Sequence, residues 1–313
     1  MPIPALFAAQ IPRQRRQNLF QRRALTCAAA ATIALASAAT AAPAASAATP
    51  MYLGAVGGVQ ELSRQTGQPL ATHGYAHFDQ GVPDGRMITV RSSASWRTVA
   101  TAGPGSSVYA DIVRWAQTIK SRPGPIFFAY HHEPEASGSA AYGTAADFVA
   151  AYRRVVSIFR AQGVRNVLYT WQMTDWAFRT SPSDARYATK WYPGDSYVDV
   201  VGADIYNWSA CRTSGGTWDE LSAMAGPFLA FARAHGKQAA LPELGSDADA
   251  RRAQWLRNAH AYLVANRDVL AAVFYFNRGP TQAAHSACTW TLTQAAEQRA
   301  FGDMARDRAY FRS

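Results

Sequence analysis

Two glutamates of this sequence each follow directly on a short apolar run. Residues 126–130 lead through His131 and His132 into Glu133, and residues 239–242 lead into Glu243. A pair of carboxyl groups can cleave a glycosidic bond, because one protonates the leaving oxygen while the other attacks the anomeric carbon. This chemistry requires a fold that brings the ends of two separate apolar runs together.

Strand-like segments, short and nearly continuously apolar, recur along the chain. This pattern is typical of strands that are buried on both faces. We expect eight strands, at residues 52–58, 70–78, 87–91, 125–131, 166–171, 198–206, 238–242 and 270–276. Glu133 and Glu243 then follow the fourth and the seventh strand.

Helical periodicity fills most of the intervals between these strands. The clearest stretch is 145–161, where Phe148, Tyr152 and Phe159 share one stripe. We also expect helices at 108–119, 218–235, 250–266 and 292–310. Between strands one and two, two and three, and five and six, the pattern is weaker and indicates short or irregular helices.

This alternation predicts an α/β fold, a single (β/α)₈ TIM barrel, in which catalytic groups lie at the carboxyl ends of the strands. A doubly wound open sheet is the alternative. It receives little support, because the first strand is followed by Gly57-Gly58-Val59-Gln60-Glu61 rather than by a dinucleotide-binding G-x-G-x-x-G turn, and no P-loop occurs.

The N-terminal segment has the composition of a secretory signal. Residues 1–23 hold five arginines and no acidic residue, an Ala-rich run extends from Ala24 to about Ala42, and Ala45-Ser46-Ala47 fits a signal-peptidase site. We expect cleavage after residue 47 and a secreted catalytic domain at 48–313. A membrane anchor is the alternative, but Pro43 breaks the run and alanine is weakly apolar.

Removing this segment changes the charge and the cysteine count. Five of the 31 Lys and Arg residues leave with it, so the formal charge falls from +10 to +5. No basic stripe suggests a nucleic-acid partner. Of the three cysteines, Cys211 and Cys288 remain, and an exported chain with one pair favours a disulfide between them.

Three stretches of the sequence resemble glycoside hydrolase family 26. They are His132-Glu133, Leu241-Pro242-Glu243-Leu244-Gly245, and the segment 191–206, which ends in Ala203-Asp204-Ile205-Tyr206. The resemblance implies a retaining hydrolase with Glu133 as acid/base and Glu243 as nucleophile. It also implies that Tyr206 hydrogen-bonds the nucleophile and that His132 contacts a sugar hydroxyl. Members of this family act mainly on β-mannans, with β-1,3-xylan and mixed-linkage β-glucan as minority substrates.

The sequence departs from the family in two places. His132-Glu133-Pro134-Glu135-Ala136 stands where His-Glu-Met-Asn-Gly is common, which makes Glu135 a rival acid/base. Strand eight ends in Asn277, where many related barrels have tryptophan. These departures leave the glycan open, as well as the alternative of a barrel that binds polysaccharide without cleaving it.

Aromatic and polar residues near strand ends are candidates for sugar contacts. We expect Trp171 and Trp208 to be stacking platforms, and His77 and Arg91 to contact substrate. His131 has the opposite strand parity to His132 and should pack in the barrel wall. We expect the other aromatic residues of the rim to pack within their loops: Tyr75, Phe78, Trp96 and Trp176.

The histidines and glutamates around residue 133 also permit a metal-dependent hydrolase. Their spacing is not H-E-x-x-H, and adjacent histidines on a strand point to opposite faces. We therefore expect no metal and no cofactor. The partner should be a polysaccharide, and the secreted chain should be a monomer that has no membrane attachment after signal cleavage.

Overall fold

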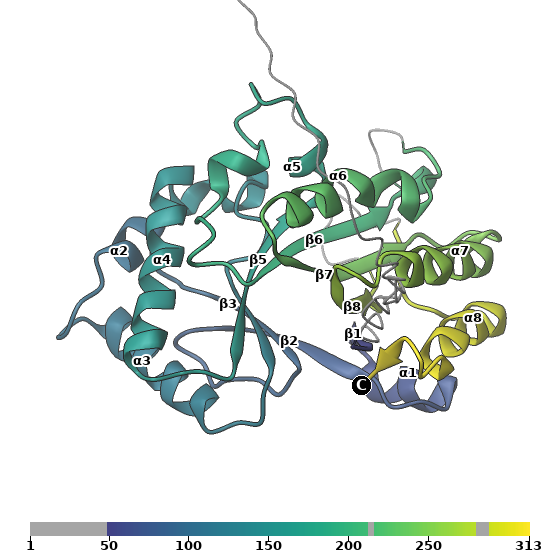
Figure 1. Ribbon diagram of the computed structural model, residues 1–313, viewed down its shortest axis with the longest axis horizontal. Coiled ribbons are helices and arrows are strands. Elements are labelled where there is room, and N and C mark those ends of the chain that lie inside the picture. Colours follow the sequence, from purple (N-terminus) through teal and green to yellow (C-terminus); the bar gives the residue numbers. More distant parts are fainter. Residues whose placement is uncertain (1–48, 212–215, 280–287) are drawn as a thin grey trace, which may run out of the picture. The chain divides into compact units, whose positions relative to one another are not determined.

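A computed structural model describes residues 49–211, 216–279 and 288–313, so the expected signal peptide at 1–47 lies outside the described residues. Eight parallel strands close into a barrel, since β1 pairs with both β8 and β2 (Figure 1). They are β1 (Met51–Val56), β2 (Ala71–His77), β3 (Met87–Arg91), β4 (Ile126–Tyr130), β5 (Val167–Thr174), β6 (Val200–Asn207), β7 (Gln238–Ser246) and β8 (Leu270–Phe276). The predicted (β/α)₈ barrel is confirmed, and the open sheet is excluded.

Helices lie around the outside of the strands (Figure 1). They are α1 (Val59–Thr66), α2 (Trp96–Ala100), α3 (Ser107–Lys120), α4 (Ala145–Ala161), α5 (Asp175–Arg179), α6 (Leu221–Ala234), α7 (Arg252–Ala265) and α8 (Ala295–Arg306), with 3₁₀ turns η1 (Ser137–Tyr142), η2 (Ala188–Trp191) and η3 (Ser209–Cys211). As expected, α1 is short and the β5–β6 connection is irregular. A further strand, β9 (Phe311–Arg312), pairs with the start of β1.

The helix α4 illustrates how sequence sets these boundaries. Thr144 accepts a hydrogen bond from the backbone of Asp147, and Asp147 accepts one from the backbone of Thr144, which forms a capping box. Phe148, Tyr152 and Phe159 then lie on the buried face of the helix. The predicted stripe therefore packs into the layer between helices and strands.

Strand β7 is irregular at Glu243. The register of its pairing shifts on both sides. Against β6 the shift falls between Gly202 and Ile205 of that strand, and against β8 it falls between Leu241 and Leu244 of β7. Pro242 lacks the N–H that a ladder would use, and such interruptions produce bulges that redirect a side chain. Gly202 makes room for this proline, because a Cβ there would lie 3.0 Å from the Pro242 ring.

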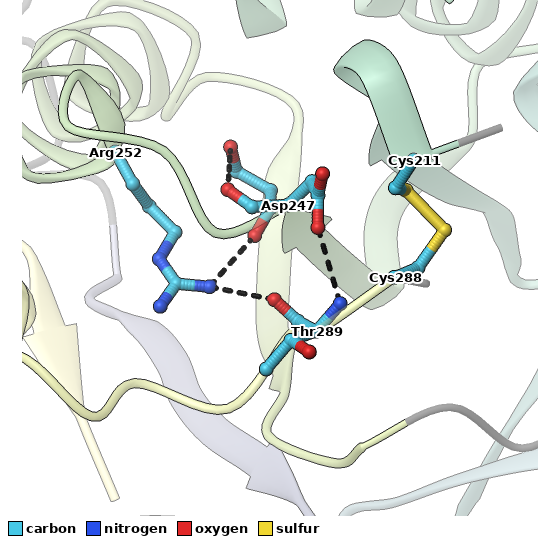
Figure 2. Close-up of a disulfide and its surroundings, with 6 residues drawn as sticks. Cys211, Asp247, Arg252, Cys288 and Thr289 are labelled. Atoms are coloured by element: carbon cyan, nitrogen blue, oxygen red, sulfur yellow. Dashed lines mark hydrogen bonds between the residues drawn. A yellow bond between two sulfur atoms is a disulfide. The ribbon is translucent and has the colours of Figure 1, made fainter. Parts of the chain in front are cut away.

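The predicted disulfide between Cys211 and Cys288 is present, with 4.9 Å between the two Cα atoms. Figure 2 shows Thr289, next to Cys288, held on both sides. Its N–H donates to Asp247 at 3.1 Å, and its carbonyl accepts from Arg252 at 2.7 Å. The chain beyond β8 is thus tied to the chain beyond β6 and to the end of β7.

No helix in the described part of the chain is both long enough and apolar enough to span a bilayer.

Candidate active site

Glu243 is held at both carboxyl oxygens. The hydroxyl of Tyr75 on β2 donates to Oε1, and the hydroxyl of Tyr206 on β6 donates to Oε2. The bond expected from Tyr206 is therefore present. Tyr75 was not predicted as a site residue, although it shares strand parity with His73 and His77 and so faces the barrel interior with them.

Gly245 provides the space that Tyr206 occupies. A Cβ at this position would lie 2.7 Å from the Tyr206 ring and 3.3 Å from the Trp290 ring. Trp290 packs on Tyr206 with 4.7 Å between ring centroids, and Trp208 packs on Trp290 at 5.1 Å. The chain has no tryptophan at the end of β8. Trp290, which lies thirteen residues after Asn277, packs against Tyr206 at this place.

The segment after β4 has an unusual backbone. His131 and Glu133 have φ values of 55° and 47°, in the left-handed region that side chains with a Cβ rarely adopt. The Glu133 N–H donates to the carbonyl of Gln172 at 3.0 Å, and the Glu133 carbonyl accepts from the Ser139 hydroxyl at 3.1 Å. Surrounding contacts therefore hold a strained conformation at this glutamate, a pattern that clusters at functional sites.

His131 is buried and supports this segment from behind. The Trp96 indole N–H donates to His131 Nδ1 at 3.1 Å, and His131 Nε2 lies 3.2 Å from the Ser139 hydroxyl. Burial lowers the pKa of His131 to about 3, so the ring is neutral and Nε2 carries its proton. The expectation that His131 packs in the wall is correct, whereas Trp96 has a more specific role than loop packing.

Glu135 is buried and engaged elsewhere. Its Oε1 accepts from the backbone N–H of Thr174 at 2.7 Å and from the Thr174 hydroxyl at 2.6 Å. Burial raises the pKa of Glu135 to about 7, against the effect of these hydrogen bonds. Glu135 thus joins the segment after β4 to the end of β5, while Glu133 is partly exposed.

The two predicted catalytic glutamates differ in their electrostatics. Burial raises the pKa of Glu133 well above its usual range, and the negative charges of Glu243 and Glu135 raise it further. Burial also raises the pKa of Glu243, but the hydrogen bonds from Tyr206 and Tyr75 oppose that rise. Neighbouring carboxyl groups whose environments separate their pKa values are typical of an acid and a nucleophile.

Arg91 and His132 lie together at the ends of β3 and β4. The Arg91 guanidinium donates to His132 Nε2 at 3.1 Å. Burial and the Arg91 charge both lower the pKa of His132, so the imidazole is neutral. Arg91 also lowers the pKa values of Glu133 and Glu243. The Arg91 charge therefore acts on both glutamates. Contact of Arg91 or His132 with substrate remains a prediction.

The prediction that Trp171 is a sugar platform is wrong. Trp171 has no exposed surface and packs against Phe178, Tyr192 and Phe231, outside the barrel. The predicted strand ended at Trp171, but β5 continues to Thr174, and its inward-facing residue at this level is Gln172.

Two other residues predicted to contact substrate, Trp208 and His77, are partly exposed. Trp208 is partly exposed beside Trp290, so a stacking role is still a prediction. His77 is partly exposed at the end of β2, where its ring lies 3.4 Å from the Ser93 hydroxyl. Trp176, expected to pack within its loop, is instead 44% exposed.

Four buried side chains inside the barrel were not predicted as site residues: His73, Thr89, Gln172 and Asp204. Within the described residues, no group of three or more His, Cys, Asp or Glu side chains is arranged to hold a metal ion.

Solved structures with this fold include several glycanases. The catalytic domain of a family 26 endo-β-1,4-mannanase from Bacillus sp. JAMB-750 matches with a TM-score of 0.57 at 17% identity, covering 85% of this chain and 88% of that one. A family 26 β-mannanase from Bacteroides ovatus matches at 0.55 and 15%, covering 84% and 87%. An endo-β-1,4-glucanase variant from Xanthomonas axonopodis pv. citri matches at 0.55 and 13%, covering 82% and 94%. At these identities the likeness shows the fold alone.

Sequence comparison gives the family. Endoglucanase H of Acetivibrio thermocellus is 28% identical over 184 residues, which is 55% of this chain and 20% of that protein. The chain thus spans about a fifth of that relative's length. The profile of glycosyl hydrolase family 26 matches residues 52–267. The chain belongs to glycosyl hydrolase family 26.

Proposed function

We propose that this protein is a secreted, endo-acting β-glycanase that retains anomeric configuration and acts on β-mannan-type polysaccharide. The observation that carries the proposal is the pair of unlike carboxyl groups. Glu243 is fixed by Tyr75 and Tyr206, and Glu133 has its pKa raised by burial and by the charge of Glu243. Family membership and the mannanase and glucanase relatives support a β-glycan substrate.

The reaction proceeds in two displacements. In the first, the Glu243 carboxylate attacks the anomeric carbon, the bond to the leaving oxygen breaks, and Glu133 gives its proton to that oxygen. A covalent glycosyl ester forms on Glu243. In the second, Glu133 takes a proton from water, the water oxygen attacks the anomeric carbon, and Glu243 leaves as a carboxylate. Loss of the Glu243 charge in the ester lowers the Glu133 pKa, which suits its change from acid to base.

Glu133 is a better acid/base than Glu135. Glu135 is buried and occupied by Thr174, whereas Glu133 is a partly exposed residue whose carboxyl accepts no hydrogen bond from the described residues. An acid/base must reach the leaving oxygen and then water. The intact pair also weighs against the second candidate, a barrel that only binds polysaccharide, since binding needs neither carboxyl.

Export rests on the N-terminal segment and on the disulfide. Disulfides persist in oxidising compartments, and the bridge from Cys211 to Cys288 is consistent with secretion. We propose that residues 1–47 are removed and that the mature protein is a monomer. Intact-mass measurement of the exported protein should give an N-terminus at Ala48, and a retained leader would contradict this.

The activity is tested on β-mannan, β-1,3-xylan and mixed-linkage β-glucan with wild type, Glu133→Ala and Glu243→Ala. Wild type should release oligosaccharides fastest from mannan. Each variant should lose more than about a thousandfold in kcat, because both displacements depend on these groups. Glu61→Ala, on the exposed surface of α1, is the matched control. Full activity in both site variants would refute the assignment, and binding without release by wild type would favour the binding protein.

A further inference from the structure

A chain of hydrogen bonds joins four buried side chains inside the barrel. His73 Nδ1 lies 2.9 Å from the Pro242 carbonyl oxygen, and its Nε2 lies 2.8 Å from the Thr89 hydroxyl. The Thr89 hydroxyl lies 2.9 Å from Oε1 of Gln172, whose Nε2 lies 2.9 Å from both oxygens of Asp204. None of the four side chains belongs to a residue that is more than 3% exposed. The Pro242 carbonyl belongs to the peptide bond that joins Pro242 to Glu243.

Only two arrangements of protons satisfy this chain. A carbonyl can only accept, so His73 Nδ1 must carry a proton, and Thr89 has one proton to give. If Thr89 donates to Gln172 and the Gln172 amide donates to Asp204, as the amide is oriented in the structure, then His73 donates at both nitrogens as an imidazolium, and Asp204 is a carboxylate. If Thr89 donates to His73, then the Gln172 amide is turned, and Asp204 donates to it as a carboxylic acid. The two arrangements contain the same number of protons, because the amide has nearly the same shape in either orientation.

The surroundings favour the uncharged arrangement. Asp204 faces the acidic groups Glu243, Glu133 and Glu135, and Tyr75 and Tyr206 are also close. His73 faces the positive charge of Arg278 and has neutral His132 nearby. Burial lowers the pKa of His73 to about 3, while burial and the neighbouring carboxylates raise the pKa of Asp204 well above its usual range. The first arrangement would bury two charges, each beside a group of like sign, which is costly.

We propose that Asp204 is a neutral carboxylic acid in the working enzyme, and that the uncharged chain His73–Thr89–Gln172–Asp204 positions the peptide that carries Glu243. These four side chains touch no reacting atom and act through Glu243, so they are positioning residues.

The catalytic consequence rests on the proposed roles of Glu133 and Glu243. With Asp204 neutral and Glu135 occupied by Thr174, the charge that changes during the reaction is that of Glu243. Formation of the glycosyl ester removes this charge, and the Glu133 pKa then falls because no other nearby carboxylate charge replaces that of Glu243. An anionic Asp204 would keep holding that pKa up and would hinder the change of Glu133 from acid to base.

The protonation state can be read without any turnover. The carbonyl stretch of a protonated carboxyl group is absent from a carboxylate, so infrared spectra of wild type and Asp204→Asn at pH 7 should differ by the loss of one protonated-carboxyl band. Asp199→Asn is the matched control, because Asp199 precedes the same strand and binds the Tyr169 N–H at the opposite end. Loss of a carboxylate band instead would overturn the proposal, whether or not the protein is a glycanase.

A second measurement on the unmodified protein covers the case that Asp204→Asn does not fold. Histidine side-chain ¹⁵N NMR distinguishes a neutral ring from an imidazolium, and His73→Asn assigns the signal. His73 should remain neutral, with its proton on Nδ1, from pH 8 down to pH 5. An imidazolium signal for His73 at pH 7 would contradict the uncharged chain.

The kinetic readout is the basic limb of the pH profile of kcat/KM. Asparagine keeps both the zero charge and the donor to Gln172, so the limb should not move in Asp204→Asn, and Asp204→Leu should have a lower kcat than Asp204→Asn. If Asp204 is an anion, its removal lowers the Glu133 pKa, and the limb moves to lower pH by about one unit or more. Such a shift, with none in Asp199→Asn, would refute the neutral Asp204.

Discussion

Glu243 and Glu133 both follow strands of one barrel, but the protein fixes different parts of the two residues. At Glu243, two tyrosine hydroxyls hold the carboxyl oxygens and a neighbouring glycine makes room for one of the rings. At Glu133, the surroundings hold the backbone in the left-handed region, and the described residues give its carboxyl no hydrogen bond. A nucleophile needs one fixed direction of attack, whereas an acid/base must serve first the leaving oxygen and then water.

Among substitutions that leave both glutamates in place, the largest effect should come from filling the space beside Tyr206. In Gly245→Ala the new Cβ would lie 2.7 Å from that ring, so Tyr206 must move away from Glu243. Misplacement of a catalytic group by about 1 Å can cost roughly a hundredfold, and we expect a loss of that size in kcat. Gly226→Ala is the matched control, because its Cβ meets nothing within 4 Å on an exposed part of α6. Equal kcat values in the two variants would show that the space does not matter.

Removing either hydroxyl tests how the carboxylate of Glu243 is held. Tyr75→Phe and Tyr206→Phe each delete a hydrogen bond to a charged group, which is worth a loss of about tenfold or more in kcat/KM. These bonds lower the Glu243 pKa, so their loss raises it and moves the acidic limb of the profile to higher pH. Tyr109→Phe, on α3, should move neither. An acidic limb that stays in place in both site variants would contradict the account.

Glu135 tests the segment after β4 through the pH dependence of the free energy of unfolding. Its folded pKa is about 7, above the model-peptide value of 4.5, so the folded state binds more protons between these pH values. Stability contributed by the protonated group is therefore full below pH 4.5 and is lost as pH rises toward 7. Glutamine mimics the protonated form, so Glu135→Gln should gain roughly 3 kcal/mol relative to wild type between pH 4.5 and 8. Urea unfolding at both values measures this, with Glu61→Gln as control, and no difference between the two pH values would be the contrary result.

The smallest effect is expected from the backbone support of Glu133. Ser139→Ala deletes one neutral hydrogen bond to the Glu133 carbonyl and one contact with His131. A bond of this kind is worth about 1 kcal/mol, so kcat should fall severalfold with no shift of either limb. Ser137→Ala, exposed in the same turn, is the control. A shifted basic limb in Ser139→Ala would mean that this support also sets the Glu133 pKa.

Sequence reasoning placed the barrel and its eight strands because buried parallel strands leave an apolar signature. It found Glu243 and Tyr206 because both lie in a stretch that resembles the family. Tyr75 could have been predicted as a site residue, because the alternation His73, Tyr75, His77 places all three side chains on one face of the strand. Trp171 was misassigned because β5 continues beyond the apolar run, which ends where Gln172 begins the polar interior.

Other parts of the site have no local signal. The contact of Trp96 with His131 joins α2 to the end of β4, and the chain from His73 to Asp204 draws on four strands. Each of these residues is ordinary in its own segment. Only closure of the barrel brings them together, so their partners could not be read from spacing along the chain.

The most direct test of the central claim is to trap the covalent intermediate. A 2-deoxy-2-fluoro mannoside with a good leaving group should react once and remain attached, because the fluorine slows both displacements while the good leaving group speeds only the first. Peptide mass spectrometry should then place the sugar on Glu243, with no label in Glu243→Ala. A label on Glu133 or Glu135, or product of inverted configuration from the natural substrate, would contradict the account.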